Sequence, residues 1–299
     1  MRPHGSAALI GVVLVAAACS ATAAPTTEPL VTAATAPTTT TTAAPTTTRP
    51  TTTTTALPAT TTTISPFARP AWLGTQTLPL RPDGFGEVQP TPPELVDRRL
   101  ETTDRLPPPS GDVFESTLGP IPNDVLARSS WEKGCPTAVD DLSYMTVSHM
   151  GFDGVFHTGE LIVDTAYGED IVEVFRKLHA ARFPIEYLAV VPSSAIDAPP
   201  TGDWNNSASF VCRPATQSTS WSQHAYGRAI DINPFHNPYL RGDLVIPELA
   251  SAYTARDNVR PGMIVDGDVV TEAFADAGWS WGGNWNSLKD WMHFSRSGR

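Results

Sequence analysis

The most informative segment of this 299-residue chain is Ser222-Gln-His224-Ala-Tyr-Gly227-Arg-Ala229-Ile-Asp231. His224 and Asp231 are separated by a glycine, Gly227, that permits a sharp turn. Asp231 interrupts an apolar run, 229–232, that indicates a short buried strand. A carboxylate in such a strand is costly unless it binds a metal or has a partner. The spacing therefore predicts that both side chains face one point where a loop enters a strand.

A second motif, Asp290-Trp-Met-His293-Phe, lies close to the C-terminus and supplies a third candidate ligand, His293. Two histidines and one aspartate, with one position left for water, are typical of a catalytic zinc site. Zinc lowers the pKa of a bound water, and a further carboxylate must then accept the water's proton. Asp290, three residues before His293, is the natural candidate for this base.

Together these two motifs resemble the M15 family of zinc D,D-carboxypeptidases and L-alanyl-D-glutamate endopeptidases. The resemblance extends over residues 140–299, where the family-like segments are "GFDGVFHTGELIV", "ARFPIEYL", "SASFVCRP", "AIDINPFHNPY" and "GWSWGGNW". The resemblance implies one Zn²⁺ per chain, held by His224, Asp231 and His293, with Asp290 as catalytic base. It also implies that Arg213 polarises the scissile carbonyl, which agrees with the ability of a fixed guanidinium to stabilise an oxyanion.

The family likeness implies cleavage of a peptide bond in peptidoglycan stem peptides. Carboxypeptidase members commonly have Glu at the base position and endopeptidase members often have Asp, so Asp290 favours an L-alanyl-D-glutamate endopeptidase. D-alanyl-D-alanine carboxypeptidase activity is the alternative, in which Arg213, Arg228 or a group of backbone amides would capture the terminal carboxylate. A non-catalytic zinc-holding wall-binding module is a third interpretation, although neither the base nor the arginine is missing. The ligand spacing disfavours a non-haem iron oxygenase.

Outside these motifs, alternating helix and strand patterns predict an α+β domain, with a small antiparallel sheet flanked by helices and the zinc site in a cleft. Several connections are too short for parallel crossovers. Helices are expected at 168–182, where apolar residues recur at helical spacing, and at 269–277. Strands are expected at 144–150, 160–165, 185–191, 229–232 and 291–295, with a long polar loop at 192–221.

The N-terminal part has a different composition. Residues 1–18 indicate an export signal, and Cys19 follows an Ala-rich run that resembles a lipoprotein processing site. Residues 19–118 are rich in Thr and Pro and predict a disordered tether, because such a segment buries little apolar surface. The part from residue 67, which has a few apolar residues, is expected either to stay extended or to pack loosely on the domain. The catalytic domain is then expected at 119–299. We therefore expect an extracytoplasmic protein of the cell envelope, lipid-anchored at Cys19 or otherwise secreted.

The formal net charge of −11 and the lack of a basic cluster argue against nucleic-acid partners. Membrane contact is expected only through the N-terminal signal or a lipid on Cys19, and the chain is expected to be a monomer. Two cysteines remain, Cys135 and Cys212. Because exported proteins retain disulfides, a single bridge between them is expected, with two buried free thiols as the alternative.

Overall fold

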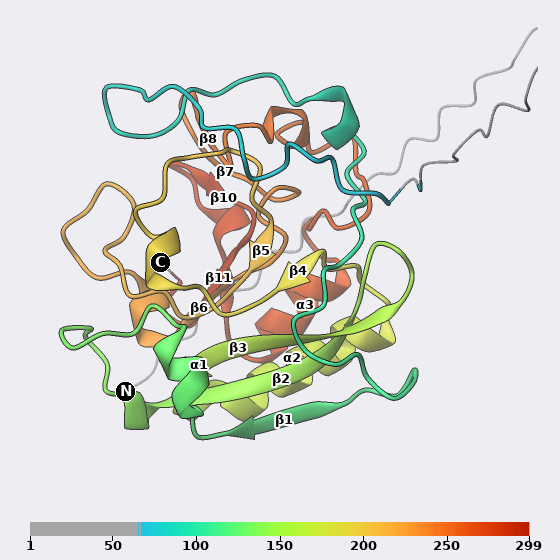
Figure 1. Cartoon of the computed structure of the whole chain (residues 1–299), viewed down its shortest axis with the longest axis vertical. Helices are drawn as coiled ribbons and strands as arrows, with labels where there is room; N and C mark the ends of the chain where they lie inside the picture. The colour runs from blue at the N-terminus through green and yellow to red at the C-terminus, as the bar shows by residue number, and fades with distance from the viewer. Residues whose placement is uncertain (1–64, 66, 299) are drawn as a thin grey trace, which may run out of the picture. The chain divides into compact units, whose positions relative to one another are not determined.

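The computed structural model describes residue 65 and residues 67–298 (Figure 1). The helices are α1 (Asn123–Ala127), α2 (Gly168–Ala180) and α3 (Val269–Asp276). The strands are β1 (Ser116–Gly119), β2 (Leu142–Met150), β3 (Phe156–Asp164), β4 (Tyr187–Leu188), β5 (Asn206–Ser207), β6 (Ala229–Asp231), β7 (Tyr239–Arg241), β8 (Leu244–Ile246), β9 (Ser280–Trp281), β10 (Lys289–Asp290) and β11 (His293–Ser295). This is the expected α+β arrangement, with small sheets and few helices.

The longest strands form the antiparallel sheet β1-β2-β3, which α2 covers (Figure 1). The apolar stripe predicted from helical spacing is buried on α2, where Ile171, Val174, Phe175 and Leu178 join the main core. Acidic residues occupy the first turn of α2, where the positive end of the helix dipole favours them. The sheet and α2 therefore form the layered base of the domain.

Two further antiparallel sheets carry the C-terminal half, with strand orders β6-β11-β9 and β10-β7-β8. The first belongs to the main core, where Phe294 of β11 stacks on Phe274 of α3 with ring centroids 4.0 Å apart. The second is a short hairpin, β7–β8, extended by β10. These two sheets bring the motif residues of the sequence to neighbouring strand ends.

One predicted strand is much shorter than expected. Only β4 forms within 185–191, and it pairs with β5 in the parallel sense. The side-chain amide of Asn206 bonds both backbone polar groups of Ala189 and so replaces a strand partner there. A side chain that satisfies the backbone locally ends the ladder, which the β-forming composition of this segment does not reveal.

The segment 67–118 packs against the domain, more tightly than the extended or loosely packed tether that was expected. Leu95 and Leu100 are buried in a second apolar core with Phe235, Val245 and Tyr253. The prediction rested on average composition, whereas these few apolar side chains suffice to order the segment. The folded part therefore begins well before residue 119.

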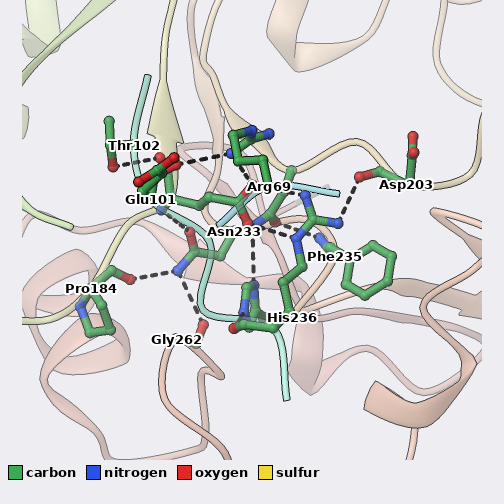
Figure 2. Close-up of polar contacts among 12 residues, drawn as sticks. Arg69, Glu101, Thr102, Pro184, Asp203, Asn233, Phe235, His236 and Gly262 are labelled. Carbon is green, nitrogen blue, oxygen red and sulfur yellow. Dashed lines mark hydrogen bonds and ion pairs between the residues drawn. The ribbon is translucent and has the colours of Figure 1, made fainter. Parts of the chain in front are cut away.

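A buried ion pair fastens this segment to the domain. Arg98 and Glu186 are each 1% exposed, and the Arg98 guanidinium donates to both carboxylate oxygens of Glu186 at 2.7 and 2.8 Å. Arg98 also donates to the backbone carbonyl of Asp203, and Asn205 donates a further bond to Glu186. Figure 2 shows the polar contacts of this region around the labelled Asp203 and His236. The His236 ring bonds the Asn205 side chain through Nδ1 and the Arg98 backbone oxygen through Nε2.

The predicted export signal, the Cys19 lipid site and the Thr-rich part of the tether up to residue 64 lie outside the described residues. Within residues 67–298, none of the helices has the length and apolarity needed to cross a bilayer.

Candidate metal centre and cleft

Local structure brings His224 and Asp231 together. Ser222 caps a 3-10 helix at Gln223–Tyr226 by accepting a hydrogen bond from the His224 amide. Gly227 ends this helix with a φ of 66°, and a Cβ atom there would lie 2.5 Å from the backbone nitrogen of Asp164. Both the backbone angle and the close approach therefore require glycine. The chain then turns directly into β6, which ends at Asp231.

His293 joins them through strand pairing. It lies directly opposite Asp231 in the antiparallel pair β6–β11. The His293 Nδ1 is 3.1 Å from Asp231 Oδ1 and 3.3 Å from His224 Nε2. The third edge, His224 Nε2 to Asp231 Oδ2, measures 3.2 Å. The structure thus brings together all three predicted ligands in a group able to hold a metal ion.

The donor set fits a tetrahedral metal. Metal–ligand bonds of about 2.0–2.1 Å at tetrahedral angles require donor atoms about 3.3 Å apart. The three observed separations are close to this value. His224 Nδ1 lies 2.6 Å from the backbone oxygen of Ser209, so Nδ1 carries the proton and Nε2 presents its lone pair to the cluster. Burial raises the pKa of Asp231, but the two histidines hold this pKa well below its usual range. The carboxylate is therefore available as a ligand.

Asp290 lies beside this cluster on β10, opposite Tyr239 of β7. Its Oδ1 atom is buried and has no hydrogen-bond partner among the described residues. Burial and the neighbouring Asp231 charge raise the pKa of the Asp290 carboxyl to about 7, although the interactions with His293 and Arg213 lower it. A carboxylate with such a pKa readily accepts a proton from a donor within hydrogen-bond reach.

The four residues line one cleft with a volume of about 590 Å³. Arg213 lines it as well, and its guanidinium donates a hydrogen bond to the neighbouring Pro214 carbonyl. The predicted disulfide is present, since Cys135 and Cys212 are bonded with their Cα atoms 5.8 Å apart. The bridge therefore anchors the residue directly before Arg213.

Several lining residues were not singled out from the sequence. Trp204 and Trp221 are 40% and 41% exposed at the cleft, and Arg241 lines it from the end of β7. The alternation of side chains along a strand places Arg241 on the same face as Tyr239. Arg228, in contrast, donates to Asp164 at 2.6 Å and does not line the cleft.

Within the described residues, the structure thus shows an α+β domain with a His₂Asp group that lines a cleft and could hold a metal ion. Residues 215–296 match the model of a family described as D-alanyl-D-alanine carboxypeptidase, in the M15 group of peptidases. The match includes the three candidate ligands and Asp290 and begins just after Arg213. It supports M15 peptidases as the relatives of this part of the chain. No curated protein and no solved structure gives a significant match.

Proposed function

We propose that this chain is a zinc metallopeptidase that hydrolyses a peptide bond in peptidoglycan stem peptides. The observation that carries this proposal is the convergence of His224, Asp231 and His293 beside a buried Asp290 oxygen that has no hydrogen-bond partner in the described part of the chain. The donor chemistry suits zinc, because imidazole and carboxylate are both common zinc ligands. The family match of residues 215–296 supports a peptidase that acts on the cell wall.

In this proposal His224, Asp231 and His293 hold one zinc ion per chain. Zinc, when bound, supplies a Lewis acid that activates water and polarises the scissile carbonyl. Asp290 accepts the proton of the attacking water on Oδ1 and passes it to the leaving amine. The pairing of β10 with β7 holds the Asp290 backbone opposite Tyr239 and so sets the position from which the carboxylate acts.

Arg213 has the complementary role. Its guanidinium lines the same cleft as Asp290 and acts on the pKa of that carboxyl. We assign it to the carbonyl oxygen of the scissile bond, where negative charge develops in the tetrahedral intermediate. The Cys135–Cys212 bridge limits the movement of this segment and keeps the cation in place.

The bond that is cut has two candidates, each favoured by one observation. Asp290 at the base position favours the L-alanyl-D-glutamate bond, since the resembling endopeptidases often have Asp there. The description of the matching family favours the D-alanyl-D-alanine bond. Peptidoglycan as substrate also implies an extracytoplasmic site of action, with the Cys19 lipid as the proposed anchor and a monomer as the proposed state.

The test is digestion of defined muropeptides by the zinc-loaded full chain, with products identified by mass spectrometry. New L-Ala and D-Glu termini would assign the endopeptidase, and loss of one terminal D-Ala would assign the carboxypeptidase. The Asp290→Asn variant serves as the control for contaminating peptidases. Stoichiometric zinc with no product would refute the enzyme and favour the non-catalytic wall-binding module.

A further inference from the structure

Arg241 occupies a defined position relative to the proposed catalytic residues. It lies two residues after Tyr239 on β7, and Tyr239 is the cross-strand partner of Asp290. Residues two apart on a strand share a face and are about 7 Å apart. Leu240, between them, points away and packs into the apolar cores. Arg241 therefore reaches into the cleft at a point displaced from Asp290 by one strand repeat.

The Arg241 guanidinium has only neutral partners among the described residues. Its Nη1 donates to the side-chain oxygen of Gln217 at 2.8 Å, and it also lies near the Tyr239 hydroxyl. In contrast, Arg81, which bonds the same β7–β8 hairpin, is paired with two acids, Asp83 and Asp243. Arg241 is thus a cation that faces the cleft without a carboxylate.

The acidic residues that line the cleft already have other partners or roles. The described lining residues include two carboxylates, Asp231 and Asp290. Asp231 is held between two histidines, and Asp290 is the proposed base. Neither is available to pair with Arg241, which is exposed to solvent, so a ligand is the source from which a carboxylate partner could come.

A strained loop holds Arg241 in place. Gln217 has a φ of 56°, which is uncommon for a residue other than glycine. It lies in the hairpin closed by the Pro214–Trp221 bridge, which also carries cleft-lining residues. The Gln217–Arg241 bond ties this hairpin to the end of β7 and restricts the orientations of the guanidinium.

We propose that Arg241 is a specificity-determining residue that binds a free carboxylate on the substrate residue directly after the scissile bond. This rests on the proposed function and extends it to substrate choice. Arg241 and Asp290 are diagonal cross-strand neighbours, about 7–8 Å apart, and this separation, together with the length of the arginine side chain, matches a carboxylate within one residue of the cleaved bond. An arginine fork recognises a carboxylate through two parallel hydrogen bonds.

Both candidate bonds offer such a carboxylate. After the L-Ala–D-Glu bond it is the α-carboxylate of a γ-linked D-Glu, and after the D-Ala–D-Ala bond it is the chain terminus. The shared chemistry is a carboxylate, and amidation removes its charge with little change in shape. Three stem peptides therefore show which of the two carboxylates Arg241 binds: the free peptide, its D-Glu α-carboxamide and its C-terminal carboxamide.

The experiment compares kcat/KM on these peptides for the zinc-loaded full chain, Arg241→Gln and Arg81→Gln. Arg81→Gln is the matched control, because it removes a cation that bonds the same β7–β8 hairpin outside the cleft. For wild type and the control, we expect kcat/KM on one of the two carboxamides to be lower than on the free peptide by about tenfold or more. In Arg241→Gln that preference should disappear, mainly through a higher KM on the free peptide.

The role of Arg241 would be overturned if Arg241→Gln lowered kcat/KM equally on the free and the amidated peptides. It would also be overturned if this variant kept the wild-type preference for the free peptide. If wild type hydrolyses none of the peptides, the proposed function fails and binding decides the inference. Quenching of the cleft tryptophans, Trp204, Trp221 and Trp285, then reports affinity for each peptide. Tighter binding of the free peptide by wild type but not by Arg241→Gln would support it, and equal binding of all three peptides would refute it.

Discussion

Asp231 on β6 and His293 on β11 are directly opposed cross-strand neighbours, and their side chains approach to 3.1 Å. Strand register, rather than loop conformation, thus sets the spacing of two of the three candidate ligands. His224 completes the group from the adjoining 3-10 helix. The positions of the three donor atoms are therefore set both by local structure, in the segment of His224 and Asp231, and by the pairing of distant strands.

Removal of His293 should abolish metal binding. With only His224 and Asp231 left, we expect His293→Ala to purify with less than about a tenth of an equivalent of zinc, measured by elemental mass spectrometry. His179→Gln is the matched control, since His179 lies on α2 and packs against Phe156. Full zinc content in His293→Ala would remove this residue from the ligand set.

Asp290→Asn should separate metal binding from catalysis. The amide keeps the shape of the side chain but cannot accept the proton, so we expect normal zinc content and a kcat lowered by about 10² to 10⁴. Asp276→Asn, at an exposed ion pair with Lys177, should leave kcat unchanged. A near-normal rate for Asp290→Asn would exclude it as the base.

The segment 67–118 should be required for stability. Arg98→Met leaves the buried Glu186 charge without its main partner, and we expect a loss of about 3–5 kcal/mol in the free energy of unfolding. Arg99→Met, from an exposed pair with Asp97, should change it by less than about 1 kcal/mol. Urea denaturation of the full chain measures both, and similar values for the two variants would contradict this role of Arg98.

Stability should fall in mild acid. Burial lowers the pKa of His149 and of His236 to about 4, whereas the unfolded chain takes up these protons near pH 6.5. The folded state therefore loses stability as the pH falls from about 6.5 to 4, by about 3 kcal/mol per histidine. Burial raises the pKa of Glu186, but Arg98 holds it below its usual range, so this pair adds a loss at still lower pH.

Thermal unfolding of the zinc-free protein checks this pH dependence without the contribution of metal release. The variant His149→Leu should show a smaller decrease in Tm between pH 6.5 and 4.5 than wild type. A Tm that stays constant over this range would contradict the buried neutral state of these histidines.

The sequence predicted the parts of the site that depend on local chain geometry. His224, Gly227 and Asp231 lie within one turn and the strand that follows, so their spacing alone indicated a shared target. The helix α2 was likewise predictable, because its apolar stripe follows the helical period. The roles assigned to the five predicted site residues stay predictions until they are tested.

Other features depend on contacts between distant segments. Arg241 reaches the cleft because β7 pairs with β10, a partnership that neither segment encodes alone. Arg98 is buried because Glu186, far along the chain, neutralises it. A Pro-rich composition predicted a tether there, although a few apolar anchors and one ion pair were enough to order the segment.

The most direct test of the central proposal is the rate of muropeptide hydrolysis by chelator-treated full chain as zinc is added back. We expect no measurable hydrolysis by the metal-free protein and full recovery at one equivalent of zinc per chain. Hydrolysis that persists without metal, or zinc uptake at His224, Asp231 and His293 with no hydrolysis, would contradict the assignment of this cluster as the catalytic centre.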